Sequence, residues 1–214
     1  MAPVRLFYLA PSHYCEKARK VLEYKRIPFR LVHVPYGDRT AVIKASGQDY
    51  VPYVQIAGRK GVTWPHIADW AEKAKPEPTL YPGEYPRATR AEARLIEHWA
   101  HQVVEEGVWK YVVADVPKAL RGELERWVFV EMQERKRGPL EVMAARKKEF
   151  LGGVKKACGL AQDLLDGHRF LLGDEPSLAD FALYGGLHPL KFTRQRIPAK
   201  FRALQAWHAR VDRL

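Results

Sequence analysis

The chain has little cysteine: Cys15 and Cys158 are the only two in 214 residues, and they lie far apart. A disulfide framework is therefore not expected, and a reducing cytoplasm is the expected location. The eight histidines show no metal-ligand spacing with the cysteines or with one another, so no metal site is predicted.

Long apolar runs are also missing. No segment approaches the roughly 20 apolar residues that a membrane span needs, and the start lacks the basic region and apolar stretch of an export signal. The sequence therefore predicts a soluble protein without a membrane partner. With 47% hydrophobic residues and six tryptophans, it has enough apolar material for a packed core.

Acidic residues are outnumbered by basic ones, which gives a net charge of +11. The excess is spread over both halves of the chain, with a local enrichment at residues 191–214, where seven residues are basic and one is acidic. A basic patch is compatible with a nucleic acid or an acidic membrane surface. No nucleic-acid-binding motif accompanies it, so we interpret it as a solvated surface that attracts small anions, and no nucleic-acid partner is expected.

The first part of the chain alternates between strand and helix patterns. Branched and aromatic residues predict strands, and apolar residues at helical spacing predict helices. The expected strands are 4–9, 29–34, 51–56 and 62–63, and the expected helices are 14–25, 42–45 and 65–75. The first strand, helix and strand form a βαβ unit, whose crossover is almost always right-handed.

A proline-rich linker at 75–86 separates this part from a second part with only helical patterns. Ile96, Trp99 and Val103 follow one helix face. Met143, Phe150, Ala157 and Leu164 repeat at seven residues, which predicts one long helix after Gly138-Pro139. We therefore expect an α/β domain at 1–82 and an all-α domain at 83–214.

The segment Ser12-His13-Tyr14-Cys15 lies where the first strand meets the first helix. The unpaired N–H groups and the dipole of a helix start favour an anion, and they stabilise a thiolate, whether that of Cys15 or that of a substrate. Ser12 is equally compatible with a simple helix N-cap.

A second segment, Ser46–Val54, places Pro52 within a predicted strand. Proline cannot donate a ladder hydrogen bond, and a cis Val51–Pro52 bond would direct the Val51 backbone groups outward to pair with an extended peptide. An ordinary edge-strand proline is the alternative.

Together these segments resemble the glutathione-transferase and glutaredoxin N-terminal domain: a strand, S-x-x-C at a helix start, a second strand, and then G-Q-x-x-V-P. Further segments also resemble this family, and the likeness covers essentially the whole chain. These segments are the third helix at 67–70, the linker at 77–82, the capping-box segment at 177–183, and the C-terminal segments at 188–190 and 206–208. The resemblance implies a thioredoxin-like N-terminal domain, a helical C-terminal domain of the glutathione-transferase type, and a homodimer.

The resemblance also implies roles for single residues. Val51 would pair with the cysteine backbone of glutathione, and Ser12, or alternatively Tyr8, would donate a hydrogen bond to its thiolate. Cys15 occupies the slot of a resolving cysteine without its nucleophilic partner, so a monothiol reaction or a buried structural thiol are the two interpretations. The expected glutathione-binding residues are Gln48, Val51, Pro52, Thr63, Trp64, His13 and Tyr14.

One departure from the family pattern concerns the γ-glutamyl end of glutathione. Family members usually have an acidic residue and a serine before the third helix, whereas this chain has Thr63 and Trp64. Trp cannot accept a hydrogen bond from an ammonium group. The resemblance predicts a transferase that activates glutathione toward an electrophilic or peroxide substrate, in a pocket with His13, Tyr14, Trp109 and Tyr111 on its walls. The alternative is a non-catalytic protein of this fold that binds a ligand or a protein partner.

Overall fold

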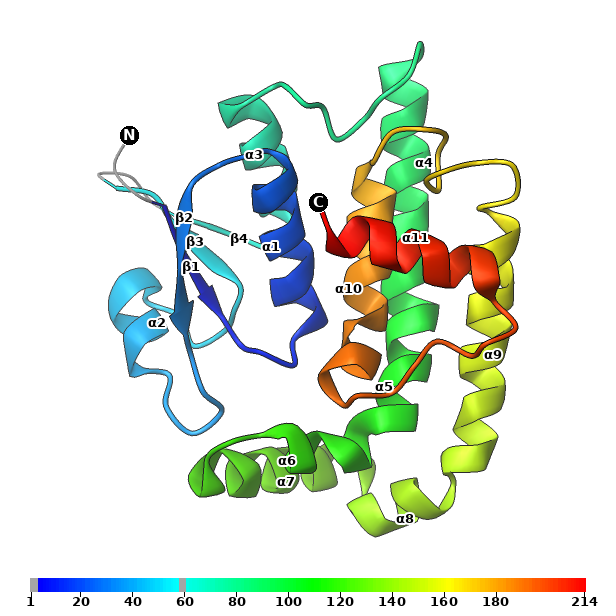
Figure 1. Ribbon diagram of the computed structural model, residues 1–214. Coiled ribbons are helices and arrows are strands. Elements are labelled where there is room, and N and C mark those ends of the chain that lie inside the picture. The colour runs from blue at the N-terminus through cyan, green and yellow to red at the C-terminus, as the bar shows by residue number, and fades with distance from the viewer. Residues whose placement is uncertain (1–3, 58–60) are drawn as a thin grey trace.

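The computed structural model describes residues 4–57 and 61–214, and residues 1–3 and 58–60 lie outside this description. Figure 1 shows a small sheet with helices packed against it in the first part of the chain and a larger group of helices in the second. The predicted α/β unit followed by an all-helical unit is confirmed. No helix in the described ranges is both long and apolar enough to cross a membrane.

The sheet has four strands in the order β2-β1-β3-β4. The strands are β1 (Val4–Tyr8), β2 (Phe29–His33), β3 (Tyr53–Gln55) and β4 (Val62–Thr63). β1 pairs in parallel with β2 and antiparallel with β3, which pairs antiparallel with β4. The parallel pair is joined by α1, as the βαβ prediction requires.

Helices cover both faces of the sheet. Neighbouring side chains of a strand point to opposite faces, and in β1 both faces carry apolar side chains that a helix buries. The three helices are α1 (His13–Tyr24), α2 (Thr40–Ser46) and α3 (His66–Ala74). Leu6 packs with residues of α1 and α3, whereas Phe7 packs with Val42 of α2. Only residues 9–12 separate the end of β1 from the start of α1, so the two lie close together at one end of the strands.

The second part consists of helices around a buried centre, α10. The helices are α4 (Pro86–Trp99), the π-helix η1 (Ala100–Glu105), α5 (Glu106–Val112), the short 3-10 helix η2 (Val113–Asp115), α6 (Val116–Ala119), α7 (Glu123–Arg137), α8 (Leu140–Ala145), α9 (Lys147–Asp163), α10 (Leu178–Phe192) and α11 (Arg202–Asp212).

α10 begins with the predicted capping box. The Asp180 carboxylate accepts from the Ser177 amide at 2.8 Å, and it also accepts from the Leu171 amide at 3.0 Å and from Trp207 Nε1 at 2.7 Å. Asp180 is fully buried, so one carboxylate joins the start of α10 to the preceding loop and to α11.

The prediction of one long helix after Gly138-Pro139 is wrong. The chain turns at Arg146, which separates α8 from α9, and Leu164 lies beyond the end of α9. Arg146 Nε donates to Glu149 Oε2 at 2.9 Å, which places an acidic side chain in the first turn of α9, where the helix dipole favours it. Apolar residues repeated at seven positions indicate a buried helix face, but that face can be divided between two successive helices.

The predicted stripe of Ile96, Trp99 and Val103 is also interrupted. Val103 is half exposed, whereas the next residue, Val104, is buried. The π-helical turn at Ala100–Glu105 adds a residue to the turn and so shifts the buried face by one position.

The two parts of the chain meet where α1 lies beside α10 (Figure 1). Gly185 of α10 is required there, because a Cβ at this position would lie 2.7 Å from the His13 carbonyl oxygen and 2.4 Å from Lys17 Cγ. Lys20 Nζ, also on α1, donates to the Asp212 carbonyl oxygen at 2.8 Å. The α1–α10 contact thereby fixes the position of the residues at the start of α1.

Candidate functional site

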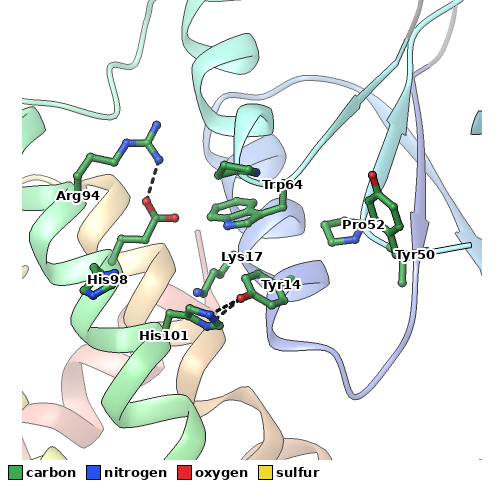
Figure 2. A pocket seen from close by; sticks show the side chains of 11 residues that line it. Tyr14, Lys17, Tyr50, Pro52, Trp64, Arg94, His98 and His101 are labelled. Atoms are coloured by element: carbon green, nitrogen blue, oxygen red, sulfur yellow. Dashed lines mark hydrogen bonds and ion pairs between the residues drawn. The ribbon is translucent and has the colours of Figure 1, made fainter. Parts of the chain in front are cut away.

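A cleft of about 630 Å³ lies between the first part of the chain and α4 (Figure 2). Its lining combines aromatic rings with charged groups. The lining residues are Tyr14, Lys17, Tyr50, Val51, Pro52, Trp64, Pro65, Arg94, Glu97, His98 and His101. Four of the predicted glutathione-binding residues are thus brought together here: Tyr14, Val51, Pro52 and Trp64.

The Val51–Pro52 peptide bond, at the entrance to β3, is cis. It lies in the same cleft as Tyr14 of α1, so the two segments singled out in the sequence face a shared space. The side chain of Tyr50, just before this bond, is more than half exposed and forms an outer wall of the cleft.

Ser12 caps the N terminus of α1. Its Oγ accepts a hydrogen bond from the Cys15 amide at 3.3 Å, and the Ser12 side chain also interacts with the Cys15 thiol. Ser12 lines a second, smaller cavity of about 200 Å³ together with His13 and Trp109. Ser12 is therefore not one of the residues that line the larger cleft.

Cys15 is buried, with 2% of its surface exposed, and its Sγ accepts from the Leu9 amide at 3.3 Å. Burial raises the pKa of the Cys15 thiol to about 11, although Ser12 and the Leu9 amide act in the opposite direction. The thiol is thus protonated at neutral pH, which favours the interpretation of a buried structural cysteine. Cys158 is likewise buried in the helical core.

Several predicted residues lie elsewhere in the described structure. Tyr8 packs on the sheet face that α1 and α3 cover, with its ring centroid 5.6 Å from that of His33, and it lines neither cavity. Gln48 Nε2 donates to the Tyr50 carbonyl at 3.4 Å, and Thr63 pairs with Tyr53 in the sheet. Tyr111 lies under Lys147, away from both cavities.

A polar network connects α1 to the π-helical turn. Glu105 Oε2 lies 2.7 Å from His13 Nε2 and 2.6 Å from His101 Nδ1, and the Tyr14 hydroxyl lies 2.6 Å from His101 Nε2. Burial lowers the pKa of His13 to about 4, with Glu105 opposing the shift, and burial raises the pKa of Tyr14 to about 12. His13 is therefore neutral, and Tyr14 keeps its proton, at neutral pH.

The same network brings together potential metal ligands. One ligand atom from each of His13, His101 and Glu105 lies within 4.8 Å of the others. Two imidazoles and a carboxylate are a donor set compatible with zinc. The histidine spacing gave no indication of this cluster, because its members come from two helices far apart in the sequence.

Lys17 is the most unusual group in the cleft. Its side chain is fully buried, and its Nζ has no hydrogen-bond partner within the described residues. The ammonium lies 5.0 Å from the ring centroid of Tyr14 and 5.7 Å from that of Trp64. Burial lowers the pKa of Lys17, while the charges of Glu97 and Glu105 act in the opposite direction.

Sequence reasoning missed the contribution of the helical part to this cleft. Arg94, Glu97, His98 and His101 all come from α4 and η1. Their spacings of three and four residues place them on one helix face, which is the signal that could have found them. Which side of the helix faces the first domain depends on packing.

The N-terminal domain model of the glutathione S-transferases matches residues 6–79, and the C-terminal domain model of the same family matches residues 141–210. The chain belongs to the glutathione S-transferase family. Its fold is accordingly the thioredoxin-like domain plus the helical domain that the resemblance implied. Among curated proteins, none matches the sequence.

Solved structures show the same fold at low sequence identity. A glutathione transferase from Phanerochaete chrysosporium has a TM-score of 0.80 at 20% identity, over 100% of this chain and 96% of its own. A glutathione S-transferase from Rhodospirillum rubrum has a TM-score of 0.76 at 21% identity, over 98% of this chain and 87% of its own. Glutaredoxin 2 from Salmonella typhimurium, solved in complex with glutathione, has a TM-score of 0.76 at 18% identity, over 100% of this chain and 96% of its own.

Proposed function

We propose that this protein is a glutathione transferase that activates the thiol of glutathione for attack on an electrophilic or peroxide substrate. Family membership and the cleft with its cis Val51–Pro52 turn support this proposal. The thiol nucleophile belongs to the cosubstrate, so the protein contributes positioning and stabilisation of the thiolate.

The observation that carries the proposal is the position of Ser12. Its Oγ accepts from the Cys15 amide at the N terminus of α1. Its hydroxyl hydrogen would donate to the thiolate of bound glutathione in place of the Cys15 thiol. A hydrogen bond to the charged form lowers a thiol pKa, and the helix terminus adds to that effect. Val51 would pair with the cysteine backbone of glutathione.

The remaining parts of the proposal rest on the family resemblance and on the sequence. These are a domain boundary near residue 82, a homodimer, and a cytoplasmic location. The two cysteines are free and buried, and free thiols are typical of proteins in reducing compartments.

The test is conjugation of glutathione to 1-chloro-2,4-dinitrobenzene near pH 7. Ser12→Ala should lower kcat/KM at least tenfold, since a hydrogen bond to a charged group contributes about 1.5–3 kcal/mol. Tyr8→Phe is the matched control, because Tyr8 lines neither cavity, and it should stay within about twofold of the wild type. Equal rates for the wild type and Ser12→Ala would refute the role of Ser12.

A second candidate function is a non-catalytic ligand-binding protein, which Trp64 favours. This ring occupies the place where the family pattern has a small polar residue, and it lines the cleft beside Tyr14 at 6.3 Å between ring centroids. Such a surface suits a flat ligand. Calorimetric titration separates the two functions: no heat with glutathione up to millimolar concentration would support the ligand-binding protein.

A further inference from the structure

The cleft contains two buried groups of opposite charge that each keep an unused bonding position. Within the described residues, Lys17 Nζ has no hydrogen-bond partner, and neither has Glu97 Oε1. Lys17 is fully buried and Glu97 is 8% exposed. Both residues line the same cleft, Lys17 from α1 and Glu97 from α4.

The neighbours of Lys17 hold its side chain in place without satisfying the ammonium group. Its stem lies against the backbone of Gly185, where a Cβ would collide with it. Tyr14 and Trp64 offer ring faces to the charge, as Figure 2 shows. Ring faces attract a cation, but an uncompensated buried ammonium remains costly, and a carboxylate brought beside it removes that cost.

Glu97 is held in a similar way. Arg94 Nη1 donates to Glu97 Oε2 at 2.8 Å, and Arg94 Nη2 donates to Asp69 Oδ1 at 2.8 Å. One oxygen of the Glu97 carboxylate is thus fixed, and the other is left for a donor from the cleft. An ammonium group supplies such donors.

We propose that Lys17 and Glu97 form a receptor for the zwitterionic head of an α-amino acid, with Lys17 binding the carboxylate and Glu97 binding the ammonium. This inference rests on the proposed function, since the γ-glutamyl end of glutathione carries such a head. In the family pattern, an acidic residue and a serine bind this head, but Thr63 and Trp64 occupy their positions here. Lys17 and Glu97 would bind the head in their place. Trp64 and Tyr14 shield the head from water.

The receptor predicts a specific ligand preference in the wild-type protein. Isothermal titration would compare glutathione with glutaryl-cysteinyl-glycine, which lacks the amino group, and with 4-aminobutyryl-cysteinyl-glycine, which lacks the α-carboxylate. Glutathione should bind at least tenfold more tightly than either analogue. Binding of all three within twofold would overturn the inference without any variant being made.

Two variants assign the halves of the receptor. Lys17→Met should bind glutathione and the 4-aminobutyryl analogue with equal affinity, and Glu97→Gln should lose the preference for glutathione over the glutaryl analogue. Lys73→Met and Glu92→Gln remove the same charges from exposed positions of α3 and α4 and should keep both preferences. If Lys17→Met and Glu97→Gln retain the wild-type preferences, the assignment is wrong.

The outcomes also separate this inference from the proposed function. Ligand discrimination without conjugation activity would support the receptor and refute the transferase. Conjugation without discrimination would do the reverse. If glutathione does not bind, γ-glutamyl-p-nitroanilide, which has the head but no thiol, decides: binding that depends on Lys17 and Glu97 supports the receptor, and no binding refutes it.

Discussion

At His13, burial determines the protonation state. The imidazole is held in the neutral form because its pKa is lowered to about 4, and it lies against the Glu105 carboxylate. The same carboxylate oxygen approaches His101, which in turn contacts the Tyr14 hydroxyl. Glu105 is therefore the residue on which the polar network between the two domains depends.

We expect Glu105→Ala to lower the free energy of unfolding by about 1–3 kcal/mol, because His13 would be left buried without its acceptor. Glu105→Gln keeps one oxygen acceptor and should lose less. Urea denaturation at pH 7 measures both changes. Equal stability of Glu105→Ala and the wild type would show that the network contributes nothing to the fold.

His208 gives a prediction about pH. It stacks on Tyr184 at 4.7 Å between ring centroids, and burial lowers its pKa to about 4, with Asp212 opposing the shift. The unfolded state binds the proton first, near pH 6.5, so stability falls as pH decreases from 6.5 to 4. This shift corresponds to about 3 kcal/mol over that range.

His208→Gln should remove this part of the pH dependence. The difference in unfolding free energy between pH 7 and pH 4.5 should be smaller in the variant than in the wild type, by about 2 kcal/mol. His98→Gln, at an exposed position of α4, is the control and should leave the difference unchanged. Parallel pH profiles for the wild type and His208→Gln would contradict the prediction.

At the scale of single elements, α10 depends on its first turn. Asp180 accepts from two backbone amides, one indole and the Ser177 hydroxyl, all of them buried. Removal of a buried acceptor that serves four donors costs more than loss of an ordinary cap, because each donor stays desolvated.

Asp180→Ala should therefore destabilise the protein by about 3 kcal/mol or more, as measured by chemical denaturation. Asp163→Ala, at the last residue of α9, is a suitable comparison and should change stability by less than about 0.5 kcal/mol. A loss below 1 kcal/mol in Asp180→Ala would mean that water replaces the carboxylate at the four donors.

For the whole molecule, the α1–α10 contact couples the two domains. Gly185→Ala should push α1 away from α10 and cost about 1–3 kcal/mol, since the new methyl group meets the His13 carbonyl. Gly153→Ala, on the open face of α9, meets nothing within 4 Å and should be neutral or slightly stabilising. Thermal denaturation and proteolysis of the linker at 76–86 report on both variants.

Local patterns predicted the elements of the first domain well, because each strand and helix there is short and bounded by Pro or Gly. They failed at Arg146 and Val103, where backbone turns interrupt helices without any break in composition. Of the residues expected at the candidate site, four line the cleft: Tyr14, Val51, Pro52 and Trp64. Lys17 and Glu97 were missed. Whether a charged side chain on a helix is buried or exposed depends on how the neighbouring domain packs against that helix, which the local pattern does not show.

Because of the wide turn at Ala100–Glu105, the number of residues between α4 and α5 helps to determine the geometry of the site. It amounts to a single inserted residue between two regular helices, and it decides which of its side chains reach toward α1. Deletion of one residue there, such as Gln102, would restore ordinary helical pitch while α4 and α5 keep their own buried faces. His101 and Glu105 would then be three residues apart instead of four, so the geometry of their pair would change without any exchange of one amino acid for another.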